Sequence, residues 1–381
     1  MQPADRLSRL PMYVFASLGA RIRALQAEGL DVIRLDIGSP DMPPPDLIIE
    51  ALHRSALNPD HHGYAGYLGT PALRQATADY YAQRFGVALD PASEVLPLIG
   101  SKEGIVNMAL AWLDPGDLAL VPDPGYPSYR MGSYMAGGEA YAVPLLAEND
   151  FLPDLDAIPG DVADRARLLW LNYPNNPTGA VAPLEFFERV MAFARQHDLL
   201  ICHDAPYTDI AFDGYQAPSL LQVPGAKQVA VEFNSLSKSH NMAGWRVGMA
   251  VGNAAAINAL LRIKSNVDSG IFRAIQDAAV VALTGDQGWL AERNAVYQRR
   301  RDMILATLEE VGLRARCPQA SLYIWADVPQ GYTAADFADK LLRETGISIT
   351  PGTAFGQYGE GYLRISLGQD TGRIAEAMDR L

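Results

Sequence analysis

The chain of 381 residues is predicted to be an α/β protein, with a mostly parallel sheet sandwiched by helices in a large domain, plus a smaller α+β domain. Short apolar runs alternate with longer amphipathic stretches, and strands that alternate with helices form parallel sheets covered on both faces. After about residue 275 the pattern changes to one long charged helix and short alternating segments. We therefore expect residues 45–275 to form the large domain, and residues 1–44 and 276–381 to form the small domain.

Within the large domain, residues 97–113 are expected to form a strand, a Gly-Ser turn and a helix that starts near Ser101. An amphipathic helix is expected at 183–197, because Pro183 opens it and good helix formers follow. The buried strands of the sheet are expected at 118–124, 139–145, 167–174, 199–205 and 228–237.

The small domain is expected to contain a long helix at 289–312 and strands at 320–329, 346–352 and 361–368. We interpret the run "RRRD" at 299–302 as the solvated face of that helix. The N-terminal 40 residues are expected to pack against this domain, because the segment "DVIRLDIGSPDMPPP" leads directly into the first helix of the large domain.

Composition favours a small-molecule partner. The 44 acidic and 31 basic residues give a net charge of −13, which argues against binding to nucleic acid or to an anionic membrane. The two cysteines, Cys202 and Cys317, lie in unrelated segments and indicate neither a disulfide framework nor a metal cage. No apolar run approaches the roughly 18 residues that span a bilayer, so we expect a cytoplasmic protein without a metal site.

Polar stretches that follow the apolar runs predict an anion site. They lie at 100–104, 172–179, 203–207 and 235–238, and ligands of open α/β sheets bind beyond the carboxyl ends of the strands. The free N–H groups of a helix that starts near Ser101 would bind an anion. The sequence contains neither a dinucleotide fingerprint nor a P-loop, so the predicted phosphate does not belong to a nucleotide. Further donors for it are Ser235, Ser237, Lys238 and Arg246.

Three other side chains fit a pyridine ring beside that phosphate. Asp204 ends an apolar strand, where an acid is costly unless it meets a cation. Tyr207 follows three residues later, and Asn176 lies in a turn held by Pro177 and Gly179. A carboxylate, a phenol, an amide and an amine that meet at a phosphate site predict pyridoxal 5′-phosphate as the cofactor.

Along nearly its whole length the chain resembles the fold type I, class I/II aminotransferases, through "NNPTG", "HDAPY" and "SLSKSHNMAGWRVG". This resemblance implies that Lys238 binds the cofactor covalently and then acts as a base, and that Asp204 keeps the pyridine nitrogen protonated. Asn176 and Tyr207 would hydrogen-bond to the ring hydroxyl, and Tyr126 would stack on the ring. The phosphate would be held by Ser101, Lys102 through its backbone N–H, Ser235, Ser237 and Arg246.

The resemblance also implies the substrate contacts. Arg364 matches the arginine that binds the α-carboxylate as a bidentate pair, with Gly38 and Asn176 assisting. Tyr64 matches the tyrosine that reaches the phosphate of the neighbouring subunit, which implies a homodimer with shared sites. Asn266 is expected to contact the substrate across the same interface.

The finer resemblance is to the bacterial LL-diaminopimelate aminotransferases, through "GSKEG", "VPDPGYPSY", "KSNVDSGIF" and "GEGYLRISL". It implies a ping-pong transfer between LL-2,6-diaminopimelate and 2-oxoglutarate in lysine biosynthesis. Two alternatives stay open at this point. One is an alanine, aspartate or broad-range aminotransferase, and the other is a pyridoxal-phosphate lyase that performs β-elimination at a C–S bond on the same fold.

Overall fold

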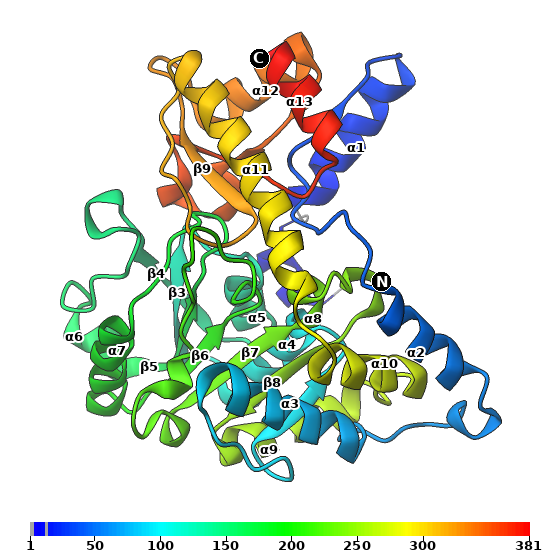
Figure 1. The fold of residues 1–381 in the computed structure, drawn as a ribbon. Coiled ribbons are helices and arrows are strands. Elements are labelled where there is room, and N and C mark those ends of the chain that lie inside the picture. The colour runs from blue at the N-terminus through cyan, green and yellow to red at the C-terminus, as the bar shows by residue number, and fades with distance from the viewer. Residues whose placement is uncertain (1–3, 12–13) are drawn as a thin grey trace.

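The computed structural model describes residues 4–11 and 14–381 and is built around a seven-stranded sheet (Figure 1). All neighbouring strands are parallel except for β8, which is antiparallel to both β2 and β7. The predicted α/β class with a mostly parallel sheet is therefore confirmed, and β8 is a strand that the sequence pattern did not predict. In spatial order the strands are β2 (Val95–Leu98), β8 (Gly248–Gly252), β7 (Ala230–Ser235), β6 (Leu200–Asp204), β5 (Ala166–Asn172), β3 (Leu118–Asp123) and β4 (Glu139–Pro144).

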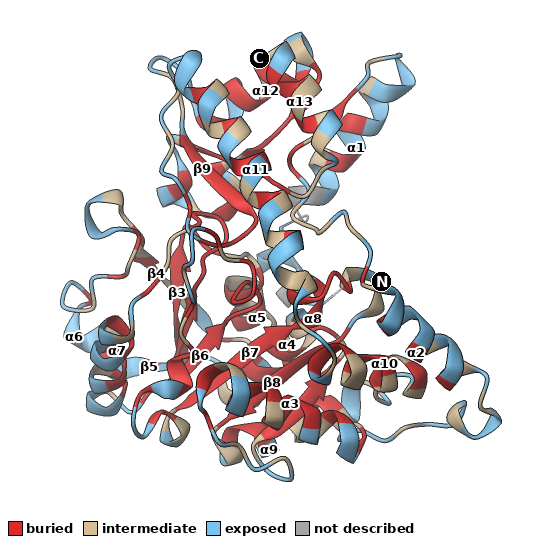
Figure 2. Cartoon of the chain, in the orientation of Figure 1, coloured by how far each residue is buried: buried red, intermediate tan, exposed pale blue. Residues whose placement is uncertain are grey.

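Helices cover both faces of this sheet, and apolar side chains at alternating strand positions pack against them on each face. Along β5, Leu168 and Trp170 pack into one core, and Leu169 and Leu171 pack into the core on the opposite face. The buried strands form the centre of the lower part of the molecule (Figure 2). The first face is covered by α4 (Ser101–Trp112), α5 (Ser128–Met135) and α9 (Ala254–Val267). The second is covered by α2 (Asp46–Ala56), α3 (Pro71–Phe85), α6 (Gly160–Arg165), α7 (Leu184–Gln196) and α10 (Arg273–Thr284).

The remaining strands form two small sheets, and β9 marks one of them in the upper part of Figure 1. Strands β11 (Thr350–Pro351), β12 (Tyr362–Ser366) and β9 (Tyr323–Asp327) are antiparallel, and β1 (Ile33–Arg34) pairs in parallel with β10 (Ile347–Ser348). Through β1, the N-terminal part of the chain thus packs against the C-terminal part. Helices α1 (Val14–Ala27), α11 (Trp289–Glu310), α12 (Ala334–Thr345) and α13 (Thr371–Arg380) complete this part.

The domain boundaries at residues 45 and 275 stay a prediction, which this separation of the sheets supports. Residues 1–3 and 12–13 of the predicted small domain lie outside the described residues.

The interpretation of residues 299–302 as a solvated face of α11 is wrong for its central pair. Arg300 and Arg301 are both buried. Arg300 forms an ion pair with Asp41 at 2.7 Å, and Arg301 forms one with Asp213 at 2.5 Å. Both carboxylates come from segments far away in the sequence, so the local charge pattern could not reveal that they neutralise the helix.

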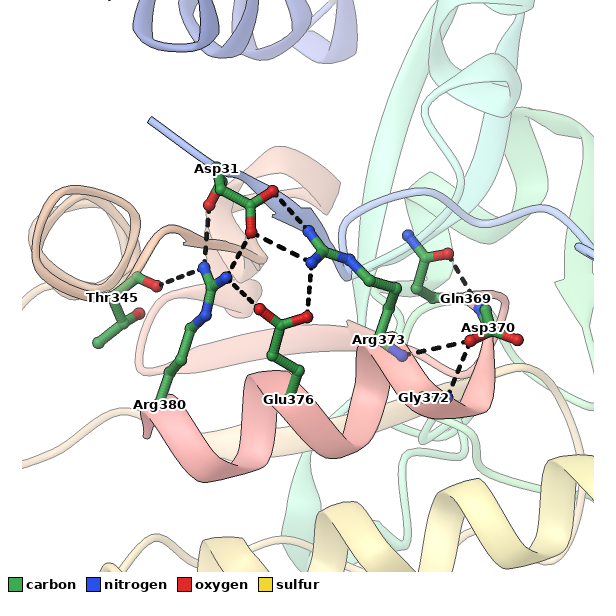
Figure 3. Close-up of polar contacts among 8 residues, drawn as sticks. All are labelled: Asp31, Thr345, Gln369, Asp370, Gly372, Arg373, Glu376 and Arg380. Atoms are coloured by element: carbon green, nitrogen blue, oxygen red, sulfur yellow. Dashed lines mark hydrogen bonds and ion pairs between the residues drawn. The ribbon is translucent and has the colours of Figure 1, made fainter. Parts of the chain in front are cut away.

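An exposed ion-pair network fixes the start of β1 to the C-terminal helix (Figure 3). The Asp31 carboxylate pairs with Arg373 at 2.7 Å and also with Arg380, and both arginines also pair with Glu376. The hydrogen bonds from Arg373 and Arg380 lower the pKa of Asp31 to about 2. The network holds the strand that leads into the cavity described next.

Candidate active site

A cavity of about 340 Å³ lies at the carboxyl ends of β5, β6 and β7 and is closed on one side by β1, β9 and β12. The structure brings most of the predicted site residues together at this cavity, although they come from distant parts of the sequence. Those that line it are Gly38, Ser101, Lys102, Tyr126, Asn176, Asp204, Tyr207, Ser235, Ser237, Lys238, Arg246 and Arg364.

Two of the predicted residues do not line the cavity of this single chain. Tyr64 is 91% exposed in the loop before α3, and Asn266 is exposed near the end of α9. Both were expected to act across a subunit interface.

Lys238 lies on α8 (Leu236–Ser239), the single helical turn that follows β7. Its Nζ donates a hydrogen bond to the Gly38 carbonyl oxygen at 2.6 Å. Burial, together with the cations of Arg364 and Arg246, lowers the pKa of the Lys238 amine to about 8. An amine with such a pKa is partly neutral near neutral pH, so it can act as a nucleophile and as a base.

Asp204 is the last residue of β6, and its side chain is buried. Its Oδ2 accepts a hydrogen bond from the Tyr129 hydroxyl at 2.7 Å, whereas its Oδ1 has no hydrogen-bond partner in the part of the chain that the structure describes. Burial raises the pKa of Asp204 to about 6, against the opposing effects of the Tyr129 hydrogen bond and the Lys238 charge. A buried carboxylate oxygen without a partner is costly, and a protonated ring nitrogen would satisfy it.

The N-terminus of α4 and the segment around Arg246 form a donor-rich wall. Gly100 has φ +74°, and a Cβ at this position would overlap the Arg246 guanidinium, so only glycine allows this close approach. Arg246 Nη1 donates to the Ala243 carbonyl oxygen at 2.9 Å and to Ser237 Oγ at 3.4 Å. Ser237 N donates to Ser235 Oγ at 3.2 Å. Helix N–H groups, hydroxyls and a guanidinium at one place form a set of donors suited to a phosphate.

Arg364 provides a further cation of the cavity, and this residue is 3% exposed. Its Nη1 donates to Asn176 Oδ1 at 2.9 Å, and its Nη2 donates to the Asp36 carbonyl oxygen at 2.7 Å. The guanidinium carbon lies 4.3 Å from the centre of the Tyr323 ring. A guanidinium held in a fixed plane can bind a carboxylate in bidentate fashion.

Sequence reasoning missed five residues that shape this site, namely Tyr129, Asn172, Tyr323, Arg34 and Asp36. Tyr129 binds Asp204, and Asn172 Oδ1 accepts from the Asn176 backbone N–H at 2.7 Å. The hydroxyls of Tyr207 and Tyr323 lie 2.9 Å apart. Tyr129 could have been found, because it follows Tyr126 by about one helical turn. The other two are Arg34 and Asp36, which line the cavity from the N-terminal segment.

The fold and the site together define a fold type I aminotransferase. The profile of the family "Aminotransferase class I and II" matches residues 30–381, and the chain belongs to this family. The family and the fold imply pyridoxal 5′-phosphate as the cofactor.

Individual proteins show similarity over the whole chain. An LL-diaminopimelate aminotransferase of Moorella thermoacetica is 54% identical over 381 residues, covering 100% of this chain and 98% of the relative. The substrate-bound structure of BacF from Bacillus subtilis is 38% identical, with a TM-score of 0.95, and covers 100% of this chain and 96% of its own. The structure of a mutant aspartate aminotransferase of Thermus thermophilus is 30% identical, with a TM-score of 0.93. The match covers 100% of this chain and 98% of that chain.

Two negative findings apply to residues 4–11 and 14–381. In this part of the chain no three His, Cys, Asp or Glu side chains are grouped closely enough to hold a metal ion. Within the same residues no helix has the length and apolar character needed to cross a membrane.

Proposed function

We propose that this aminotransferase exchanges an amino group between LL-2,6-diaminopimelate and 2-oxoglutarate by a ping-pong mechanism, as a step of lysine biosynthesis. The diaminopimelate relative with 54% identity over the full chain supports this substrate. The observation that carries the chemistry is the half-buried Lys238 amine, which shares one cavity with Arg364 and with Asp204 Oδ1, an oxygen without a hydrogen-bond partner among the described residues.

The residues of the cavity fit pyridoxal 5′-phosphate. Bound there, this cofactor would supply a reactive aldehyde and a ring that accepts electrons when the substrate Cα loses its proton. Lys238 would hold it covalently, Asp204 Oδ1 would accept from the ring nitrogen, and Asn176 and Tyr207 would contact the ring hydroxyl. Tyr126 would cover one face of the ring, and the phosphate donors would be Ser101, Lys102 through its backbone N–H, Ser235, Ser237 and Arg246.

The protein's own groups would position the substrate and move its proton. Arg364 would bind the α-carboxylate, while Asn176 and Gly38 fix the plane of the incoming amino acid. The amine of Lys238 would remove the proton from Cα, and its pKa of about 8 suits a base that works near neutral pH. The negative charge of ionised Asp204 would stabilise positive charge on the ring nitrogen. The hydrogen bond from Tyr129 holds this carboxylate in place.

A half-reaction screen tests the substrate proposal against the alternatives. The protein loaded with pyridoxal phosphate is mixed with one L-amino acid at a time, and the conversion of the cofactor to its amine form is followed by absorbance. We expect LL-2,6-diaminopimelate to react with the highest kcat/KM. Faster conversion by alanine or aspartate would favour the alternative to which the Thermus aspartate aminotransferase belongs. Release of pyruvate and ammonia without an oxo-acid acceptor would indicate the C–S lyase.

We expect the Arg364→Leu substitution to weaken the binding of every amino acid substrate. The loss of hydrogen bonds to a charged group costs about 1.5–3 kcal/mol, which corresponds to roughly a 10- to 150-fold rise in KM. Arg364→Lys is the matched control, because it keeps the charge and loses the bidentate geometry, so its loss should be intermediate. Unchanged KM values in the leucine variant would mean that another cation binds the α-carboxylate.

We also propose that the protein is a homodimer with shared active sites, in which Tyr64 reaches the cofactor phosphate of the neighbouring subunit and Asn266 lies near its substrate. Large apolar side chains are exposed in two segments of the chain: Tyr64 (91%), Tyr67 (47%) and Leu68 (42%) in one, and Val267 (61%) and Phe272 (41%) in the other. The loop that carries Tyr64 contacts the segment after α9, since a Cβ on Gly270 would overlap the backbone of Gly66. Exposed apolar side chains from adjacent segments support an interface at this place.

Hybrid dimers test the exchange of Tyr64 between subunits. Tyr64→Ala and Lys238→Ala variants, each inactive or weak alone, are unfolded together and refolded as a mixture. If Tyr64 acts on the neighbouring site, the hybrid contains one intact site, and the mixture recovers activity. Recovery would fail if Tyr64 acted within its own subunit, because each site of the hybrid would then carry one defect.

We propose the cytoplasm as the location of the protein. Its cysteines, the buried Cys202 and the exposed Cys317, are both free thiols, as is usual in a reducing compartment.

A further inference from the structure

A charged pair stands in the wall of the active-site cavity at the end of β1. Leu35 is buried in the core of the C-terminal part of the molecule, so its neighbours Arg34 and Asp36 point to the opposite side, as alternation along an extended chain requires. Both line the cavity that contains Lys238. The roles proposed above for the cofactor and for the α-carboxylate use neither side chain.

The two side chains form a bidentate ion pair. Arg34 Nε donates to Asp36 Oδ1 at 2.7 Å, and Arg34 Nη2 donates to Asp36 Oδ2 at 2.7 Å. The Asp36 side chain is 4% exposed, and that of Arg34 is 26% exposed. The hydrogen bond to Asp36 raises the pKa of the Arg34 guanidinium, so Arg34 remains charged. The ion pair therefore offers the cavity one fixed positive and one fixed negative charge, side by side.

The pair lies next to the groups that would hold the reacting end of the substrate. The Asp36 carbonyl oxygen accepts a hydrogen bond from Arg364 Nη2 at 2.7 Å, and the Gly38 carbonyl oxygen accepts one from Lys238 Nζ at 2.6 Å. A substrate that is bound by Arg364 and reacts at Lys238 therefore has its side chain within reach of this segment. The bond between Asp36 and Arg364 uses only the Asp36 backbone, so the Asp36 carboxylate is shared between Arg34 and a ligand without disturbing Arg364.

We propose that Arg34 and Asp36 form the receptor for the distal end of the substrate, and that they select side chains that end in both a carboxylate and an ammonium group. Arg34 binds the distal carboxylate and Asp36 binds the distal ammonium. A ligand end with a single charge meets one like charge and one opposite charge, and a neutral end leaves the desolvated pair without new partners. The inference rests on the proposed function, because it assumes that an amino acid reacts in this cavity.

Four amino acids with the same reacting end test the pair. LL-2,6-diaminopimelate carries both distal charges, L-2-aminoadipate carries the carboxylate, L-lysine carries the ammonium, and L-norleucine carries neither. The measurement is kcat/KM of the half-reaction for the pyridoxal-phosphate-loaded wild type and for two variants. Relative to norleucine, we expect Arg34→Leu to lose about 10- to 100-fold with diaminopimelate and aminoadipate, and Asp36→Asn to lose a similar factor with diaminopimelate and lysine.

Asp31→Asn is the control variant, because Asp31 anchors the same segment through Arg373 and Arg380 outside the cavity. It should change the rates with all four amino acids by one common factor. Equal losses with all four in the Arg34 and Asp36 variants would overturn the inference and leave the pair as a support for β1. A wild type that converts none of the four would overturn the proposed function itself, so the two failures can be told apart.

Discussion

The Lys238→Ala variant is expected to bind pyridoxal phosphate without a covalent bond and to lose at least about 10⁴-fold in kcat, the upper range for a group that transfers a proton. The amine at this position, which lines the active-site cavity, is both the proposed attachment point and the proposed base. The measurement is steady-state transamination, together with the visible absorbance of the lysine–cofactor bond, which should be absent from the variant.

Unfolding experiments on the cofactor-free protein separate this loss from a loss of structure. Because the folded-state pKa of Lys238 is about 8, below its ordinary value of 10.5, the unfolded chain holds more protons between these pH values. The wild-type free energy of unfolding should therefore rise with pH over this window, and the variant should lack this contribution. A variant that keeps the absorbance band and full turnover would contradict the assignment of Lys238.

The Asp204→Asn variant is expected to lose about 10²- to 10³-fold or more in kcat, the range for removal of a preorganised electrostatic group. The asparagine keeps the shape of the side chain and can still accept from Tyr129, but it provides no negative charge for the ring nitrogen. The measurement is kcat with the best substrate from the half-reaction screen, and an unchanged value would remove Asp204 from the mechanism.

The Asp204→Asn substitution, which lowers kcat, is expected to keep or raise the free energy of unfolding at pH 7. Burial raises the pKa of Asp204 from 3.8 to about 6, so the folded chain holds more protons between these pH values and its stability falls as the pH rises through them. At pH 7 the ionised, buried carboxylate therefore costs stability in the cofactor-free protein. The asparagine variant should unfold at an equal or higher denaturant concentration at pH 7, and Tyr129→Phe is the matched control that keeps the charge and removes only the hydrogen bond.

Much of the site could be predicted because its residues follow strands whose apolar runs are clear in the sequence. Asp204 ends β6, and Lys238 follows β7 directly. Parallel strands bring such positions to one edge of a sheet, so local patterns were enough to predict that the two residues meet. Tyr64 and Asn266 were predicted from the family resemblance, and their roles across a subunit interface stay predictions.

The rest of the site depends on contacts between segments that are far apart in the sequence. Tyr323 meets Tyr207 only because β9 packs over the carboxyl end of β6. The ionic role of Arg300 depends on Asp41, which lies in the N-terminal segment. The short β1 gives no clear periodic signal, so Arg34 and Asp36 could be assigned to the cavity only from the structure.

The central claim is that the amine of Lys238 forms the covalent bond to the cofactor. The most direct measurement is borohydride reduction of the pyridoxal-phosphate-saturated protein, followed by digestion and mass spectrometry of every lysine-containing peptide. The lysines of the chain are Lys102, Lys227, Lys238, Lys264 and Lys340, so each can be examined individually. We predict one stoichiometric adduct, on Lys238, and an adduct on another lysine, or on none, would contradict the account.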